Sequence, residues 1–322
     1  MPASAGLPGI GVGTWAWGNQ FLWGYDPSQD GQLEATFRRA VELGLRFFDT
    51  ADSYGTGRLN GRSETLLGRF CAGLDPAQRS RLCLATKLAP FPWRLGRQGF
   101  ARAFAASRKR LQGQLDRVQL HWSTSRYAPW QEGPLLDGLA DLVLRGEVSS
   151  LGVSNMGPQR LRRIHGQLAR RGVPLTSLQV QFSLLCPGGI EPGGVVEVCR
   201  ELGIELIAYS PLALGLLGRG PGESVPRGPR GALFRRLAPE VAPLLATMAA
   251  VAAPHGAPLA AVALNWCRSH GAMPIPGLRS PEQVEGVAEA LCWQLEPAAR
   301  DALDRQARQL RRRMPGNPFT SA

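Results

Sequence analysis

Lysine is scarce in this chain of 322 residues. Lys87 and Lys109 are the only two, and arginine supplies the rest of the 37 basic residues. A guanidinium keeps its proton at any ordinary pH, whereas the pKa of an ammonium responds to its surroundings. A lysine kept at Lys87, in a chain so biased toward arginine, therefore indicates chemistry there. The alternative is that Lys87 has no chemical role and is one of two lysines retained by chance.

The sequence offers little for a metal site, a disulfide or a membrane span. It has no Cys-x-x-Cys and no cysteine at metal-ligand spacing from a histidine, so we expect reduced thiols and no bound metal. The beginning of the chain resembles neither a signal peptide nor a transit segment. Prolines interrupt the most apolar stretch, residues 241–266, which argues against a membrane span. These features predict a cytoplasmic protein. The six cysteines are Cys71, Cys83, Cys186, Cys199, Cys267 and Cys292.

The formal net charge of +12 comes mainly from arginines. They concentrate in three segments that have helical patterns, residues 102–110, 160–171 and 300–313. No aromatic residues alternate with them, as they would on a surface that stacks nucleic-acid bases. Solvated helix faces are therefore the favoured interpretation, and we expect no nucleic-acid partner.

Short apolar runs alternate with helical patterns along most of the chain, which predicts an α/β fold. Up to the seventh, the runs begin roughly 27 to 36 residues apart, the size of a strand and helix unit. No GxGxxG follows any of them, which argues against a dinucleotide-binding open sheet. The expected strands are residues 11–15, 46–50, 82–87, 118–122, 150–154, 178–182, 205–210 and 273–276. Helices are expected at residues 32–43, 63–71, 100–111, 135–144, 158–171, 195–202, 241–253 and 259–268.

Three expected strands end in titratable residues. Asp49 ends the run that begins at Arg46, with Tyr54 in the following loop, while Lys87 and His121 end the next two runs. The carboxyl ends of the strands of a parallel barrel share one face, where active sites are built. Each residue alone has a structural alternative: Asp49 and Lys87 as a buried ion pair, Tyr54 as its loop cap, and His121 as a core histidine. Their order at successive strand ends favours a joint site.

Four sequence elements resemble the ordered signature of the aldo-keto reductases. They are DTADSYG at 49–55, ATKL at 85–88, LHW at 120–122 and GVSN at 152–155. The resemblance extends from Gly11 to about Leu291. It implies one (β/α)8 TIM barrel domain over residues 1–322 and a cofactor-covering role for the long loop after the seventh strand, residues 211–238. The residue pattern itself predicts C-terminal helices at 279–291 and 296–312 and a loose tail at 315–322.

The resemblance assigns four catalytic roles in the NADPH-dependent reduction of an aldehyde or ketone to an alcohol by hydride transfer. Tyr54 would be the general acid. Lys87 would lower the pKa of Tyr54, and Asp49 would hold Lys87 charged and oriented. His121 would donate a hydrogen bond to the substrate carbonyl.

The same resemblance implies a site for NADPH or NADP+. Arg279 would meet the 2′-phosphate, which favours this cofactor over NADH. Where the family often has Glu and Asn to clasp the adenosine, this chain has Gly286 and Val287, so contacts at that end are in doubt. The implied cofactor-binding residues are Gly13, Thr14, Ser154, Asn155, Gln181, Tyr209, Ser210, Leu212, Gly215, Arg279 and Gln283.

Indole side chains are expected to line the substrate site. They suit a flat aromatic carbonyl compound better than a phosphorylated sugar. The stretch GTWAWGNQFLWGY resembles the plastid and cyanobacterial branch of the family that includes pyridoxal reductase-like proteins, so pyridoxal is a candidate substrate. The alternative function is a slow, NADP(H)-sensing subunit like the potassium-channel β subunits; a scaffold without cofactor is a third. The oligomeric state is left open. The expected substrate-binding residues are Trp15, Trp17, Trp23, Trp93 and Trp122.

Overall fold

The computed structural model describes residues 9–220 and 223–321, and a sheet of eight parallel strands forms its centre. The strands pair in chain order, from β1 with β2 to β7 with β8. Each overlaps a range predicted from the sequence. The strands are β1 (Val12–Gly13), β2 (Phe47–Asp49), β3 (Cys83–Leu88), β4 (Arg117–Leu120), β5 (Ser150–Ser154), β6 (Leu175–Gln181), β7 (Glu205–Tyr209) and β8 (Ala272–Ile275).

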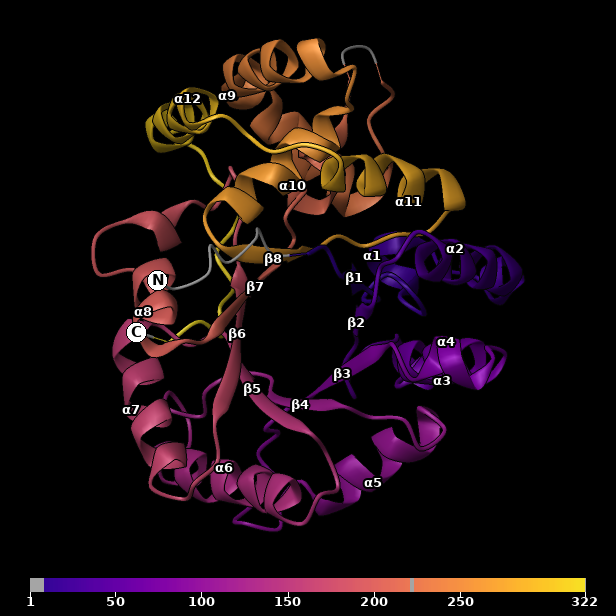
Figure 1. The fold of residues 1–322 in the computed structure, drawn as a ribbon, viewed down its shortest axis with the longest axis vertical. Coiled ribbons are helices and arrows are strands. Elements are labelled where there is room, and N and C mark those ends of the chain that lie inside the picture. Colours follow the sequence, from indigo (N-terminus) through magenta and orange to yellow (C-terminus); the bar gives the residue numbers. More distant parts are fainter. Residues whose placement is uncertain (1–8, 221–222, 322) are drawn as a thin grey trace.

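Helices follow the strands and surround them, so the predicted (β/α)8 barrel is confirmed (Figure 1). Short helices α1 (Gln20–Trp23) and α4 (Pro76–Arg79) lie outside the predicted ranges. The longer helices are α2 (Asp30–Glu42), α3 (Arg62–Ala72), α5 (Ala101–Arg110), α6 (Pro129–Leu144), α7 (Pro158–Ala169), α8 (Val195–Leu202), α9 (Gly228–Ala252), α10 (Leu259–Ser269), α11 (Pro281–Ala288) and α12 (Pro297–Gln309).

Successive side chains along each strand point alternately into the barrel interior and outward to the layer under the helices. In β2, Phe48 points outward and packs against Phe37 of α2, with ring centroids 4.9 Å apart. Phe47 points inward and joins Ala85, Ile207, Met273 and Ile275 in a separate apolar cluster. Asp49, two residues beyond Phe47, therefore points inward as well, above this apolar layer.

Two glycines close the barrel between β1 and β8. The amides of Gly11 and Gly13 donate to the carbonyl oxygens of Pro274 and Pro276, at 3.0 and 2.9 Å. A Cβ atom on Gly13 would lie 2.8 Å from the carbonyl oxygen of Ile275. Only glycine allows the two backbones to approach this closely, which is why the first strand is short and rich in glycine.

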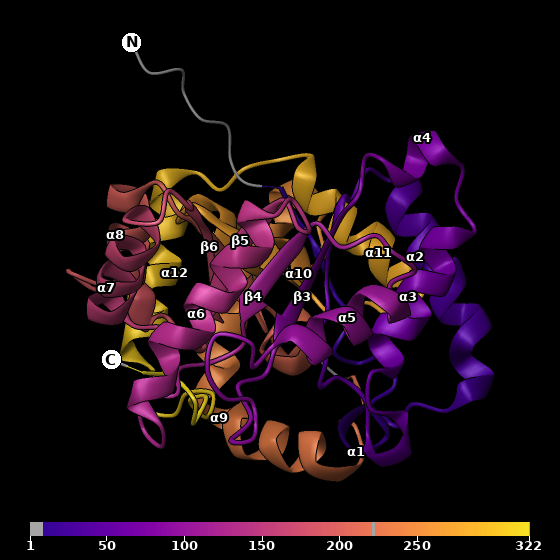
Figure 2. The ribbon, with the colours of Figure 1, turned by 90° about the horizontal axis from the view of Figure 1, so that it is seen from below.

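The region after β7 differs from the sequence prediction. We expected an irregular stretch through residue 238, but α9 already begins at Gly228 and continues through Pro239 and Pro243. The buried side chains Leu237, Val241, Leu244 and Met248 form one face of α9, and α9 contacts α10, α12 and α1 (Figure 2). The free energy gained by packing this face offsets the loss of the two amide hydrogen bonds that the prolines remove. By length and composition alone, the helical stretch Gly228–His255 could cross a membrane, but this packing is typical of a helix within a folded domain.

The segment after α12 also differs from its prediction. Residues 315–321 were expected to form a loose tail, but the structure places them against the carboxyl ends of the strands. Ser321 forms a parallel bridge with Met156, just beyond β5, and the amide of Ser321 donates to the carbonyl oxygen of Asn155 at 3.0 Å. Ala322, the last residue of the predicted tail, lies outside the described residues.

Candidate active site

A cavity of about 780 Å³ opens at the carboxyl ends of the strands. This is the face on which barrel enzymes build active sites, and the volume is typical of a site for an organic ligand or cofactor. Most of the residues predicted from the sequence meet there. Those lining the cavity are Gly13, Trp15, Trp23, Asp49, Tyr54, Lys87, His121, Trp122, Ser154, Asn155, Gln181, Tyr209, Ser210, Leu212, Gly215 and Gln283.

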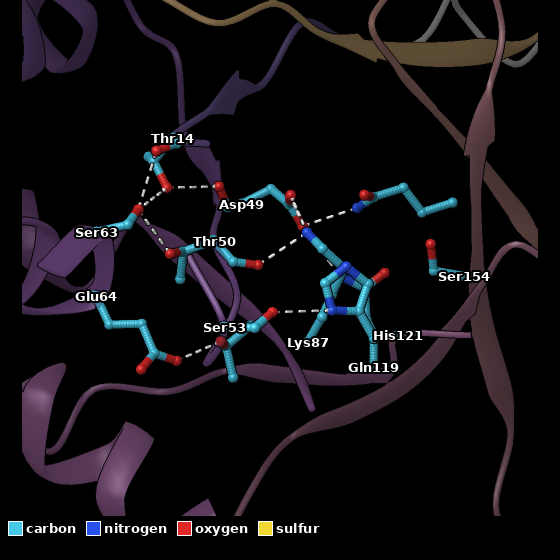
Figure 3. A network of polar contacts seen from close by, with 12 residues as sticks. Thr14, Asp49, Thr50, Ser53, Ser63, Glu64, Lys87, Gln119, His121 and Ser154 are labelled. Atoms are coloured by element: carbon cyan, nitrogen blue, oxygen red, sulfur yellow. Dashed lines mark hydrogen bonds and ion pairs between the residues drawn. The ribbon is translucent and has the colours of Figure 1, made fainter. Parts of the chain in front are cut away.

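An ion pair between Lys87 and Asp49 forms the floor of the cavity. The Lys87 ammonium donates to an Asp49 carboxylate oxygen and to the Thr50 carbonyl oxygen, the latter at 2.8 Å (Figure 3). The side chains are only 1% and 2% exposed. Burial lowers the pKa of Lys87, and the neighbouring carboxylates oppose that effect. The pair is thus fixed in position, as the sequence prediction required.

Two glutamines complete the environment of Asp49. The side-chain amides of Gln119 on β4 and Gln179 on β6 donate to the second Asp49 carboxylate oxygen, at 3.1 and 2.7 Å. A buried carboxylate needs several donors to offset its lost hydration. The sequence analysis missed both residues, although each lies at an inward-pointing position of its strand, which alternation could have identified.

Tyr54 and His121 lie close to this pair and to each other. The Lys87 nitrogen lies 4.9 Å from the centroid of the Tyr54 ring, and the rings of Tyr54 and His121 are 5.8 Å apart. Three segments distant in sequence therefore direct a phenol, an ammonium and an imidazole to one place. This is the joint site that the order of the motifs predicted.

The electrostatics of Tyr54 differ from the expectation. Burial raises the pKa of Tyr54 well above its ordinary value, and the negative charges of Asp49 and Asp52 raise it further. The predicted lowering of this pKa by Lys87 is therefore not observed, because burial and the two nearby carboxylates, rather than the ammonium, determine the direction of the shift. Tyr54 therefore keeps its proton throughout the neutral range, as a proton donor must.

His121 is neutral in this environment. Burial lowers the pKa of His121 well below its ordinary value, and the charges of Lys87 and Arg94 lower it further. The Ser53 hydroxyl lies 3.5 Å from His121 Nδ1 (Figure 3). A neutral imidazole carries one N–H group, which can donate a hydrogen bond to a ligand oxygen.

Asn155 connects three strand ends. Its side-chain amide donates to the His121 carbonyl oxygen at 3.0 Å and to the Ser154 hydroxyl at 3.1 Å. Its carbonyl oxygen accepts from the Tyr209 hydroxyl at 2.9 Å. Asn155 has φ 62°, a conformation that asparagine tolerates better than most residues. The sequence predicted Ser154, Asn155 and Tyr209 as a group, and the structure brings them into direct contact.

A cluster of arginines lies at the other end of the cavity. Arg230, at the start of α9, lines the cavity together with Arg219. Burial lowers the pKa of Arg230, and the positive charges of Arg279 and Arg219 lower it further. Its Nε atom is buried without a hydrogen-bond partner. A bound anionic group would reduce the repulsion among these arginines and would accept a hydrogen bond from the unpartnered Nε of Arg230.

Trp23 supports this arginine cluster. The Arg230 guanidinium lies 4.2 Å from the Trp23 ring centroid, and Arg279 donates to the Trp23 carbonyl oxygen at 2.7 Å. Trp23 was predicted as a substrate residue, but the structure places it between arginines. Arg279, predicted to bind phosphate, belongs to the cluster although its side chain does not line the cavity as the structure stands.

Three other predicted residues lie outside the cavity. Trp17 is fully buried, packs against Phe70 and donates from its indole to the Leu278 carbonyl oxygen at 2.8 Å, so its predicted substrate role is wrong. Trp93 is 72% exposed and does not line the cavity. Thr14 is buried and joins the end of β1 to α3 through Ser63, with the two hydroxyl oxygens 2.7 Å apart. It is a structural residue here.

Several cavity residues were not predicted. Gly286 and Val287, where the adenosine contacts were in doubt, do line the cavity. Apart from the position of Arg219 and Arg230 in the long insertion after β7, nothing in the sequence indicates that they line the cavity. The unpredicted residues of the cavity wall include Ser53, Gln179, Arg219, Glu223, Arg230, Met314, Pro315, Gly316, Asn317, Pro318 and Phe319.

Comparisons with known proteins agree with this geometry. Residues 9–307 match the aldo/keto reductase family. The chain is 51% identical over 291 residues to the chloroplastic pyridoxal reductase of Arabidopsis thaliana, covering 89% of this chain and 79% of that protein. It is 37% identical over 312 residues to an uncharacterized oxidoreductase of Mycobacterium tuberculosis, covering 94% and 90% of the two chains. The aldo-keto reductase of Klebsiella pneumoniae, solved in complex with NADPH, matches with a TM-score of 0.72 and 28% identity over 97% of this chain and 95% of that one.

Proposed function

This chain belongs to the aldo/keto reductase family and is an NADP-dependent oxidoreductase, and on that premise we propose that it reduces an aromatic aldehyde with Tyr54 as the general acid. The observation that carries the proposal is the convergence of Tyr54, Lys87 and His121 at the floor of one cavity. The family resemblance named these residues, and the fold brings them together.

The residues of the cavity fit NADPH. The arginine cluster, with the unpartnered Nε of Arg230, suits the phosphate groups. At the other end, Ser154, Asn155 and Gln181 present amide and hydroxyl groups beside Tyr209, a set suited to a carboxamide and a flat ring. When bound, NADPH supplies the hydride for carbonyl reduction.

Tyr54 would supply the proton. Its raised pKa keeps it protonated at neutral pH, and a phenol in the cavity can donate to the oxygen on which negative charge develops. Lys87 lies beneath its ring, and the neutral His121 offers an N–H donor to the same oxygen. Asp49 holds the ammonium in place, and Gln119 and Gln179 hold Asp49.

The walls near Tyr54 favour a flat, uncharged ring. Trp122, beside His121, and Phe319 line this end, and Phe319 stacks on Trp122 with ring centroids 4.5 Å apart. Trp15 also lines the cavity, but its ring contacts Trp23, with centroids 6.2 Å apart. The arginines of the cavity belong to the phosphate end. We therefore propose an aromatic aldehyde without a phosphate, and pyridoxal is the first candidate because a relative 51% identical is named a pyridoxal reductase. The sensing-subunit alternative gains no specific support from the site.

NADPH fluorescence titration of the purified protein, followed by addition of aldehydes, tests the proposal. We expect tight binding, then oxidation of NADPH with pyridoxal and with benzaldehyde, and much slower oxidation with pyridoxal 5′-phosphate. Turnover of benzaldehyde without pyridoxal would reject pyridoxal and retain the reductase. Binding without turnover of any aldehyde would favour the sensing subunit instead.

A further inference from the structure

A second cavity, of about 370 Å³, lies between the ends of α5 and α6, which are neighbours around the barrel (Figure 1). Each of these helices ends a few residues before the next strand begins, so its last turn lies at the amino ends of the strands. No described residue lines both this cavity and the active site. The second cavity is therefore a separate place on the molecule, with a volume that suits a small organic ligand.

One face of α5 forms much of the wall of this cavity. Residues 101, 104, 105, 108 and 109 line it, and their spacing of three or four places them side by side along the helix. The first part of this face is apolar, with the buried Phe104 between short alanine side chains, and Leu142 of α6 adds a second buried apolar side chain. The last turn is cationic. The cavity thus suits a flat ring that carries an anionic group.

The charged side chains of the cavity have donors to spare. Within residues 9–220 and 223–321, the side chains of Arg108 and Lys109 have no hydrogen-bond or ion-pair partner. Arg145 donates from Nε to Glu147 at 2.6 Å, which leaves its two terminal nitrogens for another acceptor. Three cations and one carboxylate line the cavity. Guanidinium groups bind phosphate through charge-assisted hydrogen bonds, so this excess of positive charge favours a phosphate.

Lys109 is the unusual member of the set. It stands between Arg108 and Arg110 in a chain whose only other lysine, Lys87, is buried in an ion pair. A cation near the end of a helix stabilises the helix dipole, but an arginine would do so equally well. Only the ammonium can lose its proton, and the resulting amine can attack a carbonyl carbon. Because Lys109 is exposed, its amine is accessible to a ligand in the cavity.

We propose that the second cavity is a reversible covalent site for an aromatic aldehyde that bears a phosphate. Arg108 and Arg145 hold the phosphate, and the ring lies over Phe104 and Leu142. The neutral amine of Lys109 attacks the aldehyde carbon, a C=N bond forms, and the carbonyl oxygen leaves as water with the two amine protons. Addition of water reverses the step, which needs no oxidant or reductant. The proposed reductase selects the aldehyde without a phosphate, whereas this site selects the aldehyde with one.

Trapping of the C=N bond in the whole protein, without NADPH, tests the site. Pyridoxal 5′-phosphate is the probe, borohydride reduces the imine to a stable amine, and intact mass with peptide mapping counts and locates the adduct. We expect one adduct per chain, on Lys109, at a half-saturating concentration about tenfold lower than that of pyridoxal, which lacks the phosphate. Equal labelling by the two aldehydes would show only the ordinary reactivity of an exposed amine and would overturn the site. Adducts mainly at the α-amino group or at Lys87 would overturn it as well.

Substitutions separate the phosphate contacts from general attraction by a basic surface. We expect Arg108→Gln and Arg145→Gln each to raise the half-saturating concentration of pyridoxal 5′-phosphate about three- to tenfold and that of pyridoxal less than about twofold. Arg102→Gln, at an exposed position of α5 outside the cavity, is the matched control and should change neither. Lys109→Arg keeps the charge and should lose the adduct with an unchanged melting temperature. Equal effects of all three glutamine variants would overturn the phosphate contacts.

Competition provides a second test of the phosphate contacts. Inorganic phosphate should reduce labelling by pyridoxal 5′-phosphate and leave labelling by pyridoxal unchanged, and equal inhibition of both would contradict the proposal. Tyr54→Phe alters only the active site, so it should trap the probe as the wild-type protein does. A wild-type protein that traps the probe but reduces no aldehyde would refute the proposed function and retain this site. Reduction without trapping would refute the site alone.

Discussion

Two walls of the cavity are built in different ways. One consists of strand ends, with Asp49, Lys87 and His121 each at the end of its own strand. The other consists of connections, namely the segment between β7 and α9 and a segment after α12, residues 314–321, that we call the strap. Strand ends are held by the backbone hydrogen bonds of the barrel. Between its ends, the strap is instead held by side chains such as Arg126 and Asn317, and backbone hydrogen bonds hold it only at Met314 and Ser321. Chemistry requires fixed geometry, which the first wall supplies, and selection of ligands can be left to the second.

Replacing Tyr54, in the loop after β2 and beside the strand-end wall, should have the largest effect. Tyr54→Phe removes the proton donor and leaves the ring, so we expect kcat for aldehyde reduction to fall about 10²–10⁴-fold. The Kd for NADPH should remain within about twofold. Stopped-flow turnover and fluorescence titration measure the two quantities. A variant with full turnover would remove Tyr54 from the mechanism.

Breaking the buried ion pair should damage stability as well as turnover. Lys87→Met leaves the Asp49 carboxylate buried without its cation, which costs about 3–5 kcal/mol in the free energy of unfolding. Urea denaturation measures this loss in the free energy of unfolding. Removing both charges with Lys87→Met and Asp49→Asn should recover part of the stability and none of the activity.

A second buried carboxylate provides the control for this ion pair. Glu64 is fully buried and accepts from Arg110 at 2.6 Å, but Arg110 does not line the cavity. We expect Arg110→Met to lower stability less than Lys87→Met, because the arginine is 28% exposed, and to retain turnover. Loss of turnover in this variant would show that the two ion pairs are functionally coupled.

Replacing Arg230 on the connection wall should have a smaller and more selective effect. Arg230→Ala removes a donor from the phosphate end, so we expect the KM for NADPH to rise about tenfold, a loss of about 1.4 kcal/mol. The KM for NADH should change little because NADH lacks the 2′-phosphate. Arg235→Ala, at an exposed position of the same helix, is the matched control. A parallel rise for both cofactors would assign Arg230 to another phosphate.

The smallest effect should be that of pH. The pKa of His121 is lowered and the pKa of Tyr54 is raised, so neither group titrates between about pH 6.5 and about pH 10, the ordinary values of imidazole and phenol. We expect kcat/KM for an uncharged aldehyde such as benzaldehyde to be flat from pH 6.5 to about pH 9. A descending limb centred near pH 7 to 8 would show that the pKa of Tyr54 falls when ligands bind.

The two walls also differ in how well the sequence predicts them. Asp49, Lys87 and His121 end apolar runs, and strand order alone places such ends together. Arg126 and Asn317 are separated by nearly two hundred residues and occur in segments without periodicity. Their contacts depend on where α12 ends and on the direction that the chain then takes, which no local pattern encodes.

Trp17 and Trp93 illustrate a related limit. Both are indoles near expected strand ends, yet Trp17 packs in the core and Trp93 faces solvent. A short stretch with several tryptophans predicts that some of them line a site. It does not predict which ones, because Trp17 and Trp93 lie in turns beyond the strands, where side-chain directions follow no regular alternation.

The scarcity of lysine has a consequence for the aldehyde reduction that we propose. Aldehydes condense with accessible primary amines to form Schiff bases. Lys87 is 1% exposed and bound to Asp49, and Lys109 lies exposed on α5. Among lysine side chains, a reactive aldehyde therefore finds a single open amine, far fewer than on a surface of ordinary composition. The use of arginine for nearly every positive charge therefore limits Schiff-base formation between the lysines of this chain and the aldehyde substrate that we propose.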